Sequence, residues 1–371
     1  MLIAITSGTC LQQKIRSKVI GFDGHIQITS FNSNYSHEST PITINDSVLS
    51  KIHELTNVKN TQAFATKAGI LKTKETFEGV MLKGVSGDYN WWFFNQYIIK
   101  GDSLTISENE KNKGLIISKQ IANQLNVKLN DKVYLYFVRE NITTSRTLPF
   151  YIKGIYHTGL EDFDNTYVFG DIKHIKQLNH WDTNQIGGLE INLHNAELME
   201  KTNAKINKII GYNLLSETAK NKNKQMYDWL ALFDTNIFVI LIIMILVSII
   251  NMTSCVLILI LEKTQMIGIL KAIGSSNWSI RTIFLLNAGY LVLKGLIWGN
   301  LIGIGICLLQ YYTEIFKLDE SAYYVSSIPI NFNFTHIIGL NLITIIICFF
   351  MMIFPSYIIT KISPIKAIRF Q

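Results

Sequence analysis

Residues 236–261 read NIFVILIIMILVSIINMTSCVLILIL, and this stretch decides what kind of protein the chain is. It contains no charged residue. A helix needs about 20 apolar residues to cross the hydrocarbon core of a bilayer. Residues 280–309 and 337–360 also reach this length. The sequence therefore predicts three membrane-spanning helices in its last third.

The segments that flank these stretches alternate in charge. The loop at residues 262–277 and the C-terminal tail at 361–371 are basic, and Arg281 lies just inside the second stretch. The loop at residues 310–336 is acidic, with Glu314, Asp319 and Glu320 against Lys317. Lys-rich and Arg-rich loops stay on the cytoplasmic side of a membrane. We therefore expect the basic segments in the cytoplasm and residues 23–228 outside it, as a large extracytoplasmic domain.

Residues 23–228 have the pattern of a mixed α+β domain. Short β patterns occur at residues 25–31, 115–117, 132–138, 150–155 and 167–169. Helical patterns occur at residues 47–55, 119–125, 172–178 and 196–210, and residues 126–131 read as a turn. The cysteines are Cys10, Cys255, Cys307 and Cys348, and none lies in this domain. The domain must therefore be stabilised by its own core and not by disulfides.

The net charge of +7 does not indicate nucleic-acid binding, because Lys and Arg alternate with Asp and Glu in the domain. The first residues are apolar over about half a span and then basic, with Lys14, Arg16 and Lys18. They lack the basic start and cleavage site of a signal peptide. We interpret residues 1–22 as the outer half of a first membrane helix, which gives a four-span plan with both ends inside.

Catalytic motifs are missing from the sequence, which contains neither HExxH nor GxSxG. Gly79 and Gly84 have the spacing of a phosphate-binding loop, but Val85 occupies the position of its essential lysine. No cluster of Cys and His predicts a metal site. We therefore expect no enzyme activity and no bound cofactor in this chain.

Two local features of the domain allow a functional and a structural interpretation. The aromatic run at residues 91–94 could bind a lipid or a protein partner, or it could belong to the core. Glu161, Asp162 and Asp164 could bind a cation, but their spacing lacks the alternation of a calcium loop. For both features the structural interpretation is preferred, as core packing and as a solvated loop.

The loop between the first two long stretches reads EKTQMIGILKAIGSSN over residues 262–277. Met266, Ile269, Leu270 and Ile273 repeat at helical spacing, which predicts a short amphipathic helix. Gly274 is a candidate C-cap, and Ser276 is a candidate N-cap for the next helix. From the pattern alone, this helix either lies on lipid or docks on a cytoplasmic motor.

Together with the order of domain, spans, this loop and the SPIKAIRF tail at residues 363–370, the segment resembles the FtsX-like permeases of ABC transporters. The resemblance is greatest to the lipoprotein-releasing type, LolC and LolE. It extends to residues 6–24, to 115–138, where Asn130 replaces a usual glycine, and to 154–171.

The resemblance implies that the loop is a coupling helix seated on a separate LolD-type ATPase subunit, which binds ATP and Mg. The implied coupling residues are Glu262, Lys263, Gln265, Met266, Ile269, Leu270, Lys271 and Ile273. The apolar face would fill a groove of the ATPase, and Lys263 and Lys271 would pair with acidic groups at its rim.

The resemblance further implies a second permease copy or paralogue and a site in the cell inner membrane, with the large domain in the periplasm. Lipoproteins would be lifted from the membrane by mechanotransmission and passed to a periplasmic carrier. The carrier-docking hairpin would correspond to Arg139, Glu140, Asn141 and Arg146, although this stretch lacks the family's proline-bearing loop. Alternative readings are an FtsX-type transducer that regulates cell-wall hydrolases and a macrolide-exporter-like efflux permease.

Small and polar residues in the long stretches are candidates for helix packing or a dimer interface. They are Ser248, Asn251, Ser254, Gly295, Gly299 and Gly303. The three glycines recur every four residues, which permits close approach of two helices. Lys294 lies in mid-span, where it would face a polar interior or reach toward the membrane surface.

Overall fold

The computed structural model describes residues 1–31, 38–107, 109–139 and 142–361. The chain forms two compact units. Unit 1 comprises Met1–Lys14, Asp228–Lys317 and the chain from Ser327 onward. Unit 2 comprises Ile15–Tyr227 and Leu318–Ser326.

Unit 2 is built on a mixed sheet, which has ten strands among the described residues, in the order β12-β1-β11-β3-β4-β9-β6-β8-β5, with β7 paired to β3 and β8. β2 and β10 form a separate pair. The strands are β1 (Ile26–Ser30), β2 (Ile42–Thr43), β3 (Val58–Lys72), β4 (Phe77–Val85), β5 (Ile98–Gly101), β6 (Gly114–Ser118), β7 (Lys132–Arg139), β8 (Ile142–Tyr156), β9 (Tyr167–Asp171), β10 (Gln185–Ile186), β11 (Gly188–Leu193) and β12 (Leu214–Thr218).

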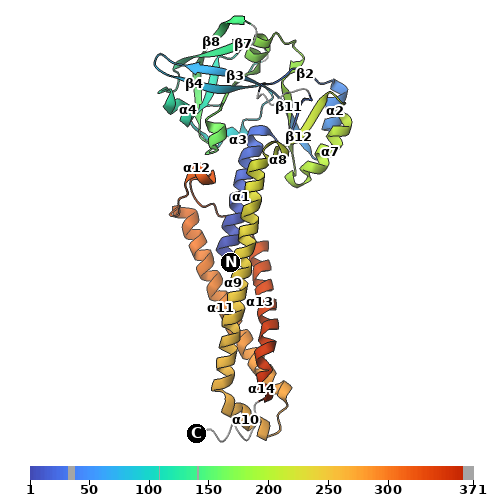
Figure 1. The fold of residues 1–371 in the computed structure, drawn as a ribbon, viewed down its shortest axis with the longest axis vertical. Coiled ribbons are helices and arrows are strands. Elements are labelled where there is room, and N and C mark those ends of the chain that lie inside the picture. Colours follow the sequence, from blue (N-terminus) through green and yellow to red (C-terminus); the bar gives the residue numbers. More distant parts are fainter. Residues whose placement is uncertain (32–37, 108, 140–141, 362–371) are drawn as a thin grey trace. The chain divides into compact units, whose positions relative to one another are not determined.

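Unit 2 also contains short helices. They are α2 (Asp46–His53), α3 (Trp92–Asn95), α4 (Lys119–Gln124), α5 (Glu161–Asp164), α6 (Ile172–Asn179), the 3-10 turn η1 (Ala196–Leu198), α7 (Met199–Ile209), α8 (Ala219–Lys222) and α12 (Glu320–Tyr323). α2 and α7 pack side by side next to β12, β1 and β11 (Figure 1). α4 and α6 cover the core formed by β4, β6, β7 and β8. The α+β pattern predicted for this part of the chain is therefore confirmed.

The glycine motif at residues 79–84 lies in β4, a central strand of the sheet. Residues Val80–Val85 of this strand are buried. A Cβ added at Gly84 would lie 2.7 Å from the Cα of Ile172, so the absence of a side chain lets α6 pack directly on the strand. A phosphate-binding loop is a turn that leads into a helix, whereas this segment is a strand.

The turn predicted at residues 126–131 contains two asparagines with positive φ, Asn126 at 50° and Asn130 at 68°. Asn is the residue other than glycine that most readily adopts this left-handed region. Asn130 can therefore replace a glycine before β7 without changing the turn.

Unit 1 consists of helices. α1 (Leu2–Asp23) begins in it, and α9 (Lys224–Glu262), α10 (Thr264–Ala272), α11 (Asn277–Thr313), α13 (Phe334–Ser356) and α14 (Ile358–Lys361) follow. Among the described residues, α9 and α11 are long and apolar enough to cross a membrane, and residues Ile337–Ile353 of α13 form a shorter apolar helix. The stretch predicted as one helix at 337–360 is divided into α13 and α14. Pro355 lies in the last turn of α13, where it provides no N–H group for the backbone ladder.

Many large apolar side chains on α9 and α11 are exposed, for example Ile250, Leu286 and Leu301, each more than half exposed. Water-soluble proteins do not leave long contiguous apolar surfaces uncovered. At the α10 end of this unit, a small core joins Val256 and Ile260 of α9 to Ile280 and Phe284 of α11.

Candidate functional site: a short helix with an exposed apolar face

The segment at residues 262–277 folds as the sequence predicts. α9 ends at Glu262, and α10 begins at Thr264. After α10, Gly274 has a φ of 97°, the left-handed conformation that ends a helix and favours glycine. The Ser276 hydroxyl accepts a hydrogen bond from the backbone N–H of Ser279, 3.2 Å away, and so caps α11.

One face of α10 packs on its own unit. Ile267 is fully buried and Gly268 is buried beside it, in the core formed with α9 and α11. Leu270 is half-buried against the same core. The Lys271 ammonium donates a hydrogen bond to the Thr360 carbonyl at 3.4 Å, and partial burial lowers the pKa of this lysine. Lys271 is thus engaged within the chain.

The opposite face of α10 is apolar and exposed. Met266, Ile269 and Ile273 are 41%, 46% and 77% exposed. Successive helical residues lie about 100° apart, so these three side chains share one side, away from Ile267 and Gly268. Glu262, Lys263 and Gln265 are also exposed. Of the four residues in the predicted apolar stripe, only Leu270 turns partly inward.

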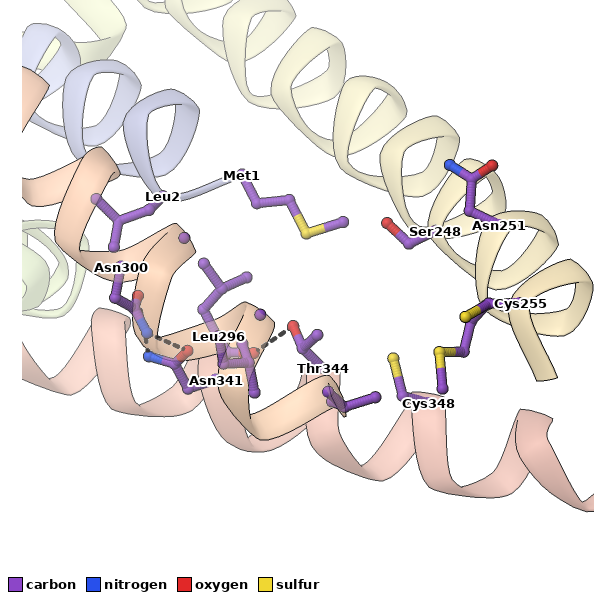
Figure 2. A pocket seen from close by; sticks show the side chains of 15 residues that line it. Met1, Leu2, Ser248, Asn251, Cys255, Leu296, Asn300, Asn341, Thr344 and Cys348 are labelled. Carbon is purple, nitrogen blue, oxygen red and sulfur yellow. Dashed lines mark hydrogen bonds between the residues drawn. The ribbon is translucent and has the colours of Figure 1, made fainter. Parts of the chain in front are cut away.

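A cavity of about 530 Å³ lies within unit 1, between the start of α1 and the helices α9, α11 and α13 (Figure 2). Its polar lining includes Ser248 and Asn251 of α9. Asn300 of α11 and Asn341 of α13 face each other in this cavity, and the Asn300 amide donates to the Asn341 side-chain oxygen at 2.8 Å.

The residues proposed for helix packing divide into two groups. Gly303 contacts Leu2, with 3.8 Å between the leucine Cδ2 and the glycine's Cβ position, so it packs α1 against α11. Gly295 and Gly299 line the cavity, and no heavy atom of the described chain lies within 4 Å of their Cβ positions. Ser254 is exposed. The mid-span Lys294 is exposed, with its ammonium 5.4 Å from the Tyr290 ring.

In unit 2, charged and polar residues meet where α1 ends and α8 precedes α9. We call Asp23, Gln27, Lys83, Glu190 and Lys222 the charge cluster; the first four are buried, and Lys222 reaches them from the surface. Lys83 and Glu190 form an ion pair of 2.6 Å, and Lys83 also donates to the Phe22 carbonyl. Gln27 donates to Glu190 at 3.0 Å.

The same cluster joins the end of α1 and the segment before α9 to the sheet. Lys222 donates to Asp23 at 2.7 Å and to Gln27 at 2.9 Å, and Asn223 donates to Asp23 at 2.9 Å. Burial alone would raise the pKa of Asp23, but the ammonium groups of Lys222 and Lys83 outweigh it and hold this pKa below its ordinary value. The sequence analysis missed this cluster, although a single charge in each of two apolar strands, Lys83 and Glu190, was a signal.

An aromatic core surrounds the end of α1. The ring of Phe22 lies 5.0 Å from that of Phe94 and 4.7 Å from that of Phe163, measured between centroids. The absence of a side chain at Gly21 lets the Phe93 ring approach, since a Cβ there would lie 2.4 Å from it. The aromatic run at residues 91–94 is therefore mainly core, as preferred, but Trp92 is 72% exposed.

The acidic turn is only partly the solvated loop that the sequence suggested, because Asp162 is exposed but Asp164 is not. Asp164 is fully buried, and it accepts hydrogen bonds from the backbone N–H groups of Thr158 and Gly159, both at 3.0 Å. Such bonds satisfy a buried carboxylate without a metal ion. Among the described residues no group of His, Cys, Asp and Glu could hold a metal ion.

The proposed carrier-docking residues lie at the end of the β7–β8 hairpin. Arg139 pairs with Ile142 across the two strands, and Phe137 pairs with Arg146, which is exposed. Glu140 and Asn141 lie outside the described residues, as does the SPIKAIRF tail.

The C-terminal part of the chain is similar to a known family, and most of the chain is similar to known membrane proteins. Residues 238–364 match the FtsX-like permease C-terminal family. The chain is 20% identical over 270 residues to the lipoprotein-releasing system transmembrane protein LolC of Xylella fastidiosa strain 9a5c, which covers 69% of this chain and 65% of that protein. It is 22% identical over 375 residues to LolC of Buchnera aphidicola subsp. Schizaphis graminum, covering 98% of this chain and 88% of that one.

A LolE protein and two solved extracytoplasmic domains are also similar to the chain. LolE of Haemophilus influenzae is 20% identical over 274 residues, which is 70% of this chain and 65% of that protein. The extracellular domain of the noncanonic ABC-type transporter YknZ from Gram-positive bacteria covers 53% of this chain and 100% of that one, with a TM-score of 0.36 and 15% identity. The periplasmic region of MacB from Actinobacillus actinomycetemcomitans covers 57% and 98%, with a TM-score of 0.37 and 13% identity.

The family match spans the long apolar helices and α10 with its exposed face. The resemblance expected from the EKTQMIGILKAIG motif is thereby confirmed: residues 238–364 match the FtsX-like permease C-terminal family, and the chain is similar to the LolC and LolE transmembrane proteins of lipoprotein-releasing systems.

Proposed function

We propose that this chain is the permease subunit of an ABC transporter in the cell inner membrane, which uses ATP hydrolysis by a separate subunit to release lipoproteins. The observation that supports it most is the exposed apolar face of α10, formed by Met266, Ile269 and Ile273. Such an apolar helix face suits a partner with an apolar groove. The ATPase subunit would provide that groove and would hold ATP and Mg.

The attachment of α10 suits it to transmit motion. It is joined directly to α9 and through a tight turn to α11, and its inner face is fixed by Ile267. A partner that moves the outer face therefore moves both long helices. Lys271 already donates a hydrogen bond to the Thr360 carbonyl, whereas Lys263 is exposed. Lys263 is therefore the better candidate to pair with acidic groups at the rim of the ATPase groove.

The long apolar helices support a place in a membrane. The exposed side chains of α9 and α11 would contact lipid, and the first part of α1 and the apolar part of α13 would complete a four-helix bundle. The basic loop at residues 262–277 would then lie in the cytoplasm and unit 2 in the periplasm.

The cavity between α1, α9, α11 and α13 supports an acylated substrate. Its lining is mostly apolar, and its volume of about 530 Å³ lies in the range of small-ligand pockets and suits part of an acyl chain. The uncovered Gly295 and Gly299 also offer a surface on which a second permease copy could pack. The names of the LolC and LolE relatives favour lipoproteins as the cargo.

Co-expression with the ATP-binding subunit of a lipoprotein-releasing system tests the coupling role of α10. We expect the Ile269→Asp variant to lose at least about tenfold in capture of this subunit, because a charge on the docking face must be desolvated. Ser275→Asp is the control, since it adds the same charge at an exposed position beyond the helix. Equal capture by wild type and Ile269→Asp would contradict the proposal.

A further inference from the structure

The loop between α11 and α13 folds with unit 2, although both of those helices belong to unit 1. Residues Leu318–Ser326, which we call the docking loop, are part of the same compact unit as Ile15–Tyr227. The backbone N–H of Leu318 donates to the Ser326 carbonyl at 3.0 Å, which closes the loop around α12. Two groups of polar contacts hold this loop in place.

The first contact is a histidine between two carboxylates. The His157 Nε2 atom lies 2.9 Å from a Glu320 carboxylate oxygen, and its Nδ1 atom lies 3.4 Å from the Asp164 carboxylate. Asp164 cannot follow the loop, because the Thr158 hydroxyl and two backbone N–H groups hold it. The Nδ1 side of the imidazole therefore faces the fixed Asp164 carboxylate without a hydrogen bond, and its Nε2 atom contacts Glu320 of the docking loop.

The backbone next to this histidine leaves room for Glu320. Gly159 has a φ of 76°, and a Cβ added there would lie 2.3 Å from a Glu320 carboxylate oxygen. A side chain at this position would both strain the backbone and displace the carboxylate. The turn is thus shaped to receive this glutamate.

The second contact comes from α1. The Lys18 ammonium donates to the Thr158 carbonyl and, at 2.6 Å, to the Tyr324 carbonyl of the docking loop. Lys18 is 5% exposed, so these bonds are shielded from water. The Tyr324 ring packs against the aromatic core around Phe22. One lysine therefore joins α1, the turn after β8 and the docking loop.

We propose that Glu320 and Lys18 are positioning residues that clamp the docking loop to the domain, so that displacement of α11 and α13 reaches the domain directly. The domain is already continuous with α1 and α9, and this clamp would give it a third mechanical attachment. The transmission step rests on the proposed function, whereas the clamp itself does not.

Hydrogen exchange on the full chain in detergent tests the clamp. We expect backbone amides of residues 318–326 to exchange at least about tenfold faster in Glu320→Ala than in wild type. Glu320→Gln should restore most of the protection, because its amide oxygen can still accept from the imidazole. Glu314→Ala is the control, since it removes an exposed carboxylate from the same inter-helix segment. Unchanged exchange in Glu320→Ala would overturn the clamp.

A second experiment separates the clamp from the proposed function. In the complex with the ATP-binding subunit, Lys18→Met and Glu320→Ala should still capture that subunit, as Ile269→Asp should not. They should reduce ATP-dependent changes in hydrogen exchange within unit 2 by at least about half, and Glu320→Gln should recover them. Full ATP-dependent changes in both clamp variants would overturn the positioning role. Failure of the wild type to capture the subunit would overturn the proposed function and leave the exchange result for the clamp intact.

Discussion

Lys83 and Glu190 form an ion pair of 2.6 Å inside the domain, with side chains 4% and 0% exposed. They lie on β4 and β11, and the pair is extended by hydrogen bonds from Gln27 and Gln62 to the glutamate. Together with Asp23 and Lys222, they connect the end of α1 and the start of α9 to the centre of the sheet. The cluster is thus one of the links between these two helices and the sheet, beside the aromatic core around Phe22.

Removing one partner of this pair should be strongly destabilising. Lys83→Met leaves the Glu190 carboxylate buried without its cation, and we expect the free energy of unfolding to fall by about 3–5 kcal/mol. Urea unfolding of the full chain in detergent, followed by tryptophan fluorescence, measures this loss. The double variant Lys83→Met, Glu190→Leu should recover a large part of it, because no unpaired charge then remains. A double variant less stable than Lys83→Met would contradict this account of the pair.

Two glycines of one strand provide a matched test of packing. Gly84→Ala would place a methyl group 2.7 Å from the Cα of Ile172, so α6 must shift, and we expect a loss of about 1–3 kcal/mol in unfolding free energy. Gly79→Ala meets no heavy atom within 4 Å and should be neutral or slightly stabilising, by up to about 1 kcal/mol. Equal effects of the two substitutions would show that α6 does not rest on Gly84.

The stability of the domain should decrease as the pH is lowered below neutrality. Burial lowers the pKa of His25 and of His174 from the ordinary value of 6.5, so the folded state binds fewer protons than the unfolded chain. The contribution of these two histidines to the free energy of unfolding is therefore fully present above pH 6.5. It is lost as the pH falls from there toward their folded-state pKa values. Unfolding curves measured from pH 8 down to pH 5 should show a free energy of unfolding that decreases with pH.

A substitution at His174 shows whether this histidine causes the pH dependence of the unfolding free energy. His174→Gln retains a donor for the Asn112 carbonyl, which His174 Nε2 contacts at 2.8 Å, and it removes the titrating group. We expect a flatter pH dependence in this variant, and an unchanged one in His53→Gln, because His53 is exposed. A slope that persists unchanged in His174→Gln would assign the effect to other groups.

The predicted strands correspond to β1, β6, β7, β8 and β9, and the predicted helices to α2, α4, α6 and α7. The strands β3 and β4 at the centre of the sheet were missed, as were β5, β11, β12 and the short pair of β2 and β10. β4 is buried on both faces over Val80–Val85, so its apolar and polar residues do not alternate, and alternation is the main signal of a strand. The apolar face of α10 was predicted from its spacing. The sequence could not show that Leu270 turns inward while Met266 and Ile269 remain exposed, because this depends on which side packs on α9 and α11.

Contacts between distant parts of the chain account for the rest of what was missed. Glu320 and His157 are 163 residues apart, and Lys83 is 107 residues from Glu190 by their positions in the sequence. No local pattern links such pairs. Asp164 was misread as part of a solvated loop for the same reason, since its neighbours Glu161 and Asp162 are typical surface residues and only the fold buries it.

Cysteine labelling from the two sides of the membrane tests the central claim most directly. In a background in which the natural cysteines are replaced by serine or alanine, Tyr212→Cys and Ser275→Cys place thiols at exposed positions, and Ser275 lies beyond the apolar face of α10. We expect a membrane-impermeant maleimide to label position 212 once the outer membrane alone is opened. Position 275 should be labelled only after the inner membrane is also made permeable. Labelling of position 275 from the outside, or of position 212 only from the cytoplasm, would contradict the account.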